Sequence, residues 1–236
     1  MKTIAIFGDA RFELGSVFQR QRADGRPLEI HDFTRSGCDA SEGLWILRQN
    51  REILLECDDV VLAFGLRDWA FDWAEVADEP YTCHEADVPM SDFLAAYRRM
   101  IWEIKGAGAH PILLTLPELD GSRYLSRVAR ELDAEAILDF LGGDEEILSR
   151  WQEDYSNMIC LLAAESRCRL IDLRKALAAK GDPARFLAPN GLTLNEAGRE
   201  VLVEQIGALL AEKSLSKRVL TISSRMPGIA AAVQTI

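Results

Sequence analysis

Short apolar runs alternate along this chain with longer stretches of helical periodicity, and this alternation limits the folds that the chain can adopt. The short runs are rich in β-branched and other apolar residues, which is typical of strands buried on both faces. Five runs have this character: Thr3–Phe7, Leu28–Phe33, Val60–Phe64, Ile112–Thr115 and Arg169–Ile171. Strands that alternate with helices predict a parallel sheet, so we expect an α/β fold, a three-layer α/β/α sandwich of about five parallel strands.

The clearest helical stretch runs from Ser91, an expected N-cap, to Lys105, and Gly106 follows it as a stop signal. Its apolar residues recur at helical spacing on one face. Three further stretches are predicted to be helical: Ser41–Leu55, Glu145–Glu165 and Leu194–Glu212. Ligands of parallel α/β sheets bind beyond the carboxyl ends of the strands. We therefore expect functional residues in the loops after the first four strands and in the segment near Asn190.

The charge balance restricts the partners of this chain. Its 236 residues, which suit one large α/β domain, include 27 basic and 38 acidic side chains, for a formal charge of −11. Such a charge argues against general affinity for nucleic acid or anionic membranes. No apolar run approaches the roughly 18 residues that span a bilayer. The apolar stretch at the N-terminus is too short for a signal peptide, and Asp9 interrupts it.

The cysteines indicate the redox setting. They are five in number, which is odd, and none of them are spaced as C-x-x-C. A disulfide framework or a zinc site is therefore not expected, and a reducing, cytoplasmic setting fits best. The sequence gives no reason to expect a metal ion or another cofactor.

The composition shifts after Lys213. The segment 214–236 carries three basic residues and no acidic one. It contains a strand-like run, Val219–Ile222, and farther on an apolar stretch, Ile229–Val233. We expect a single domain over residues 1–213, with the tail either packed on that domain or forming the contact of a homodimer.

Four strand-end or C-terminal segments carry short motifs in a fixed order. These are Gly8-Asp9-Ala10, Ser36-Gly37-Cys38, Gly65-Leu66-Arg67-Asp68 and Asn190-Gly191-Leu192-Thr193. Their order resembles that of the SGNH/GDSL hydrolase family, in which the corresponding features are Gly-Asp-Ser, an oxyanion-hole glycine, Gly-x-Asn-Asp and Asp-Gly-x-His. The resemblance covers roughly residues 3 to 212. It implies a flavodoxin-like three-layer sandwich, and it identifies ester hydrolysis as the activity of the family.

This chain departs from the family at each position of the catalytic triad. Ala10 replaces the nucleophilic serine, Thr193 the general-base histidine and Asn190 the orienting aspartate. Alanine has no lone pair for attack, threonine is no base near neutral pH, and asparagine carries no charge to stabilise an imidazolium. Loss of the nucleophile alone costs about a million-fold in rate in well-studied hydrolases. The resemblance therefore predicts an SGNH-like protein without the Ser-His-Asp mechanism.

The oxyanion hole also differs from that of the family. Gly37 keeps its backbone N–H, but Arg67 replaces the family's asparagine. A guanidinium at this position is able to bind a carboxylate, phosphate or sulfate. Alternatively, Arg67 forms an internal ion pair with Asp9 or Asp68. The leading hypothesis is a non-hydrolytic protein that binds a small ligand, with an anion as one option, or a partner protein, with these candidate binding residues: Asp9, Gly37, Cys38, Arg67, Asp68 and His84.

Several of these positions also have structural explanations that require no ligand. Thr193 and Glu196 fit a capping box, with Thr193 as the N-cap of the last helix. The pair Asn190-Gly191 is typical of a turn. Asp9, beside a strand end, is expected to accept hydrogen bonds from loop amides.

A rebuilt catalytic site is the alternative to a binding protein. Cys38 follows the oxyanion glycine, and a cysteine thiolate is a competent nucleophile. His84 lies in the long segment 65–90, which is able to fold over the site. The alternative function is thus an esterase or acylhydrolase that acts through Cys38 and His84, provided that the fold brings them together.

The segment from Trp69 to Asp87 carries four aromatic residues among six acidic ones. Aromatic side chains above a site can stack on a ligand. The alternatives are a lid or a small satellite core formed by the segment itself.

Overall fold

The computed structural model describes residues 1–25 and 27–225, with side chains as far as Ala211. Five strands form one parallel sheet in the order β2-β1-β3-β4-β5. Their bounds are Lys2–Gly8 for β1, Leu28–Asp32 for β2, Asp59–Ala63 for β3, His110–Leu114 for β4 and Arg169–Ile171 for β5. All five predicted strands exist within two residues of their expected ends, and the predicted α/β class is confirmed.

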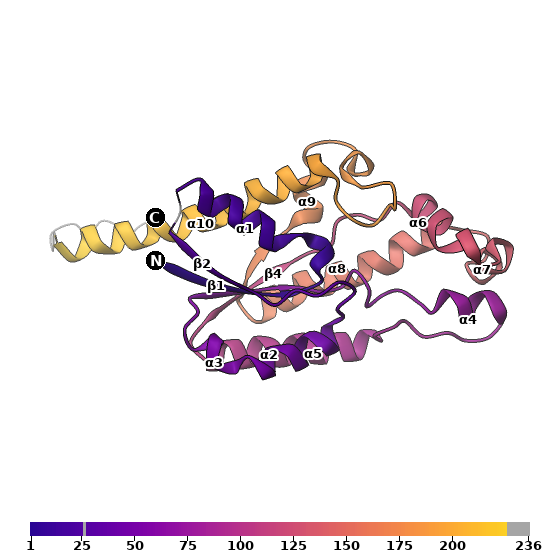
Figure 1. The fold of residues 1–236 in the computed structure, drawn as a ribbon, viewed down its shortest axis with the longest axis horizontal. Helices are drawn as coiled ribbons and strands as arrows, with labels where there is room; N and C mark the ends of the chain where they lie inside the picture. The colour runs from indigo at the N-terminus through magenta and orange to yellow at the C-terminus, as the bar shows by residue number, and fades with distance from the viewer. Residues whose placement is uncertain (26, 226–236) are drawn as a thin grey trace.

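Helices cover both faces of the sheet, as Figure 1 shows. One face carries α1 (Leu14–Ala23), α9 (Leu173–Ala178) and α10 (Glu196–Arg225). The other carries α2 (Ala40–Gln49), α3 (Arg51–Leu54), α5 (Met90–Gly106) and α8 (Glu146–Glu165). The end of the molecule away from the N-terminus holds α4 (Trp73–Asp78), α6 (Gly121–Val128) and α7 (Ala134–Phe140). Short 3₁₀ turns are η1 (Ala10–Phe12), η2 (Ala129–Glu131) and η3 (Pro183–Phe186).

The central strand β3 illustrates why the apolar runs in the sequence predicted strands. All five of its residues are buried, because neighbouring strands pair with it on both sides and helices cover both faces. Where β1 ends beside β3, Gly8 adopts a φ of 154°, and a Cβ at this position would lie 2.2 Å from the Ala63 carbonyl oxygen. Glycine is therefore required where the first loop leaves the sheet.

The predicted helices exist, but several of their ends differ from the prediction. Pro89, not Ser91, is the N-cap of α5. The stretch predicted as one helix over residues 41–55 divides at Asn50, which has non-helical backbone angles and separates α2 from α3. The Asn50 side chain donates to the Ile46 carbonyl oxygen at 2.8 Å, so it caps α2 instead of continuing it.

The last helix is longer than predicted. It passes Lys213 without a break, and the strand predicted at Val219–Ile222 is wrong because these residues lie inside α10. β-branched residues cost only about 0.5 kcal/mol each in a helix, whereas extending an existing helix adds one hydrogen bond per residue. The apolar stretch Ile229–Val233 lies outside the described residues, so the role predicted for the tail stays a prediction.

No helix in the described part of the chain combines the length and the apolar character that a membrane span needs. Each of the five cysteines is a free thiol.

Candidate functional site

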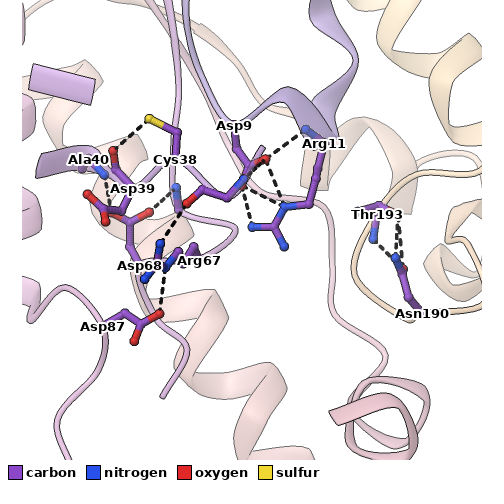
Figure 2. Close-up of polar contacts among 12 residues, drawn as sticks. Asp9, Arg11, Cys38, Asp39, Ala40, Arg67, Asp68, Asp87, Asn190 and Thr193 are labelled. Atoms are coloured by element: carbon purple, nitrogen blue, oxygen red, sulfur yellow. Dashed lines mark hydrogen bonds and ion pairs between the residues drawn. The ribbon is translucent and has the colours of Figure 1, made fainter. Parts of the chain in front are cut away.

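The loops that follow β1 and β2 meet at the carboxyl edge of the sheet, and Asp9 joins them. The Asp9 side chain is fully buried. Its Oδ1 atom accepts the backbone N–H groups of Arg11 at 2.9 Å and Gly37 at 3.3 Å (Figure 2). The prediction that Asp9 binds loop amides is thus confirmed.

Sequence reasoning missed the role of Arg11. Its guanidinium turns back onto Asp9, with Nε 3.0 Å from Oδ1 and 2.9 Å from Oδ2, and Nη2 also donates to Oδ2. The turn η1 makes this contact possible, because it places residue 11 next to the carboxylate that caps it. Ala10, the residue predicted to occupy the family's nucleophile position, lies between these two charged residues in the sequence. An arginine two residues after a strand-end aspartate was the only signal in the sequence.

The structure places Gly37 between the two arginines of the site. Its N–H donates to Asp9, so this oxyanion donor of the family is already engaged. Its carbonyl oxygen accepts from Nη1 of Arg67 at 3.3 Å. The φ of Gly37 is 71°, a left-handed value that favours glycine at this corner.

Arg67 forms an ion pair, but not with the predicted partners. Its Nε lies 3.0 Å from Oδ2 of Asp87, and this hydrogen bond raises the pKa of the arginine. Asp9 is already satisfied by Arg11, and Asp68 lies fully buried, whereas the Arg67 side chain is half-exposed. The guanidinium therefore reaches toward the surface, where the loop after α4 supplies a carboxylate.

Asp68 links the third loop to helix α2. Its Oδ1 accepts the Ala40 N–H at 2.7 Å, and its Oδ2 accepts the Gly65 N–H at 2.8 Å. Burial raises the pKa of Asp68 to about 7, while these amide hydrogen bonds oppose the rise. Its contacts are those of a residue that holds the loop to the helix.

Asn190 and Thr193 contact each other. Asn190 Nδ2 donates to Thr193 Oγ1 at 3.0 Å, and Asn190 Oδ1 accepts the Leu192 and Thr193 N–H groups at 3.0 Å each, which confirms the predicted turn. The capping-box prediction is wrong, because α10 starts at Glu196 and Asn195 Oδ1 caps it by accepting the Gly198 N–H at 3.0 Å. Thr193 lies two residues before this cap, with its hydroxyl engaged by Asn190.

The structure gives Cys38 and His84 separate surroundings. Cys38 is 1% exposed, and burial, followed by the Glu42 and Asp39 carboxylates, raises the pKa of its thiol to about 12. His84 Nε2 lies 2.9 Å from the Glu79 carbonyl oxygen, and the ring packs edge-on against Phe140. Within the described residues, the side chains of Cys38 and His84 do not contact each other. An activated cysteine requires a lowered pKa, which is the opposite of this environment.

This environment predicts a specific pattern of thiol reactivity. At about pH 8 the exposed Cys83 should react rapidly with iodoacetamide, whereas Cys38 should react only after unfolding, because a thiol of raised pKa holds almost no thiolate. Peptide mass spectrometry of timed alkylation checks this, with Cys83→Ser removing the rapid phase. Rapid alkylation of Cys38 in the folded protein would contradict the structure and support the alternative of a rebuilt catalytic site.

The aromatic segment packs into the main hydrophobic core through Trp69, Phe71 and Trp73, whereas Tyr81 is 84% exposed. Phe71 packs against Trp73, Phe140 and Trp151, with ring centroids 5.6, 5.5 and 5.0 Å away. The indole N–H of Trp73 donates to the Tyr124 hydroxyl at 3.1 Å. These rings join α4 to α6, α7 and α8 beyond the carboxyl edge of the sheet, so their faces are used in packing.

Two guanidinium groups and two carboxylates thus form a chain through Gly37, running Arg11, Asp9, Gly37, Arg67, Asp87 (Figure 2). Asn190 and Thr193 form a separate pair in the same view. Among the residues that the structure describes, no group of three or more His, Cys, Asp or Glu side chains is arranged to hold a metal ion.

The solved structures to which this chain is similar include lipases and esterases. A lipase/acylhydrolase from Enterococcus faecalis is 22% identical, with a TM-score of 0.63 over 90% of this chain and 97% of the other. An acetyl xylan esterase is 18% identical, with a TM-score of 0.62 over 88% and 98% of the two chains. A GDSL-like lipase from Bacteroides thetaiotaomicron is 12% identical, with a TM-score of 0.62 over 90% and 89%.

These similarities show that the chain has the SGNH/GDSL hydrolase fold, as its strand-end motifs predicted. At such identities they show the fold alone. No protein-family profile matches the sequence. No curated protein matches it either.

Proposed function

We propose that this chain is a non-hydrolytic protein of SGNH/GDSL fold that binds a small ligand bearing a carboxylate, phosphate or sulfate group. The observation that carries the proposal is the pair of arginines on either side of Gly37, at the edge where hydrolases of this fold act on esters. Ligands of parallel α/β sheets bind at this edge. The five free thiols fit a reducing, cytoplasmic setting for such a protein.

The surroundings of Ala10 favour binding over hydrolysis. Ala10 offers no nucleophile, and Thr193, at the base position, is hydrogen-bonded to Asn190. The Gly37 N–H, which would stabilise an oxyanion, is engaged by Asp9. Nucleophile, base and oxyanion donor are therefore all missing or occupied, and these groups act as a unit.

The arginines favour an anionic ligand. The Arg67 side chain is 49% exposed and that of Arg11 is 27% exposed. Within the described residues, Nη2 of Arg67 and Nη1 of Arg11 make no hydrogen bond, so each guanidinium keeps donors for a ligand. Planar guanidinium groups match carboxylate and phosphate oxygens in geometry and charge. Asp87 is the internal competitor for Arg67, and a ligand oxygen would share or displace it.

Binding of simple anions tests the proposal. At low ionic strength, we expect at least one of acetate, succinate, phosphate and sulfate to bind the protein in titration calorimetry and to raise its melting temperature. Arg67→Gln should abolish that binding. Asp87→Asn should tighten it about two- to fivefold, because a half-exposed ion pair worth up to about 1 kcal/mol no longer competes. Arg150→Gln, which removes an exposed arginine paired with Asp144, is the matched control and should change nothing.

Equal binding by wild type and Arg67→Gln would overturn the anion proposal, as would the failure of all four anions. Ester turnover addresses the alternative function. Purified wild-type protein should hydrolyse short-chain p-nitrophenyl esters no faster than buffer. Turnover that is lost in Cys38→Ala or His84→Ala would instead establish the esterase.

A further inference from the structure

One helical face of the molecule exposes large apolar side chains that the site does not use. The described residues include seven exposed large hydrophobic side chains, and three of them lie on neighbouring helices. Trp45 on α2 is 56% exposed, Leu55 at the end of α3 is 71% exposed, and Trp102 on α5 is 62% exposed. The helices α2, α3 and α5 adjoin one another (Figure 1). Single exposed apolar residues need no explanation, whereas several on adjoining helices are typical of interaction surfaces.

A hollow lies on the same face. It has a volume of about 390 Å³ between α3 and the C-terminal end of α5, and its lining includes Arg51, Glu52, Leu55 and Trp102. The Arg99 guanidinium stacks on the Trp102 ring, 4.4 Å from its centroid, which holds the indole in place. Projecting apolar side chains and a receiving hollow thus occur together, as a self-complementary surface requires.

The charge of this face indicates which partner it fits. Residues 40–55 and 90–106, which form its helices, carry five basic and four acidic side chains, against 27 and 38 in the whole chain. Two copies with a net charge of −11 repel each other over most of their surfaces. That repulsion is weak here, where the local charge is close to zero.

Two neighbouring charged residues supply a complementary pair. Arg48 and Arg99 both bind Glu103, with Nε atoms 3.0 and 2.8 Å from Oε1. In contrast, Arg51 and Glu52 are exposed, and within the described residues neither forms an ion pair. A twofold axis near α3 would bring Arg51 of one copy to Glu52 of the other, and the same contact would then occur twice.

We propose that the face formed by α2, α3 and α5 is the contact of a symmetric homodimer, in which Leu55 and Trp102 of each copy pack against the hollow of the other. The enrichment in tryptophan and arginine is that of the central residues of protein interfaces. The proposal is independent of the ligand site, which lies at the carboxyl edge of the sheet.

Sedimentation velocity of the full chain, from micromolar to hundred-micromolar concentration, tests the dimer. The wild type should be dimeric, and Leu55→Asp or Trp102→Glu should raise the dissociation constant about tenfold or more. Both side chains are largely exposed, so the substitutions should leave the fold of the monomer intact and the far-ultraviolet circular dichroism spectrum unchanged. Leu138→Asp, on α7 at the far end of the molecule, is the matched control and should remain dimeric.

A charge swap separates this contact from other modes of association. Arg51→Glu should weaken the dimer, and the double variant Arg51→Glu/Glu52→Arg should restore it, because the paired charges exchange places. A monomeric wild type would overturn the proposal. A dimer that is insensitive to Leu55→Asp and Trp102→Glu would overturn it too, and its loss on truncation after Lys213 would assign the contact to the C-terminal segment.

Discussion

The triple variant Ala10→Ser/Asn190→Asp/Thr193→His is expected to hydrolyse short-chain p-nitrophenyl esters about a hundredfold or more faster than the wild-type chain. The reason is that the fold keeps the geometry of a catalytic pair. The side chains of Asn190 and Thr193 already lie within 3.0 Å of each other, as an aspartate must lie to orient a histidine. Similar hydrolase structures align over 88–90% of this chain, so the fold that carries these loops is shared.

Two features keep the expected gain well below the roughly million-fold effect of a complete triad. The Gly37 N–H donates to Asp9, and Arg67 stands where the family has an asparagine donor. Each missing oxyanion donor costs about 10²–10³ in turnover. Adding Arg67→Asn to the triple variant should therefore raise turnover further.

The single variant Ala10→Ser is the control for this experiment and should stay at the wild-type rate, because a serine without a base is a poor nucleophile. Circular dichroism establishes that each variant folds. A folded triple variant with no turnover would mean that residues 10 and 193 do not face each other in a productive geometry. The assignment of the strand-end motifs to the family's catalytic positions would then be wrong.

The strands were predictable because each one satisfies a local requirement. A strand buried on both faces is apolar along most of its length, and four of the five residues of β3, Val60 to Ala63, are apolar, with the ion-paired Asp59 as the exception. The turn at Asn190 was predictable for the same reason, since an asparagine side chain that accepts amides two and three residues ahead needs no distant partner. Asp9 also follows this rule in its bond to the Arg11 N–H.

The ion pairs of the site were not predictable, because they depend on which segments the fold brings together. Arg67 pairs with Asp87 twenty residues away, and nothing local distinguishes that carboxylate from Asp9 or Asp68. Arg11 binds the Asp9 carboxylate, so that carboxylate is not available to Arg67. The N-cap of α10 failed for a related reason: Thr193 and Asn195 are both good caps in sequence, and the bond of Thr193 to Asn190 decides between them.

At the opposite edge of the sheet, Asp59→Ala is expected to lower the free energy of unfolding by about 3 kcal/mol. Asp59 is fully buried at the first position of β3, where it forms ion pairs with Lys2 of β1 and Arg169 of β5. His110 of β4 places its Nδ1 atom 3.9 Å away. One carboxylate thus joins four of the five strands.

Removing Asp59 takes away the carboxylate that Lys2 and Arg169 share, and both cations are partly buried. Such losses cost about 3–5 kcal/mol when both partners are buried. The side chains of Lys2 and Arg169 are 21% and 26% exposed, so water partly solvates these cations. The loss of unfolding free energy should therefore lie at the lower end of that range. For a domain of this size, the melting temperature should fall on the order of 10 °C.

The matched comparison is Asp144→Ala, which removes an aspartate paired with Arg150 at 2.6 Å where both side chains are at least half exposed. That change should lower stability far less than Asp59→Ala does, because water solvates the arginine that remains. Urea titrations of both variants give the comparison, and equal costs would refute the ion-pair argument. The double variant Asp59→Ala/Arg169→Met should be more stable than Asp59→Ala alone, since it also removes a cation that has lost its partner.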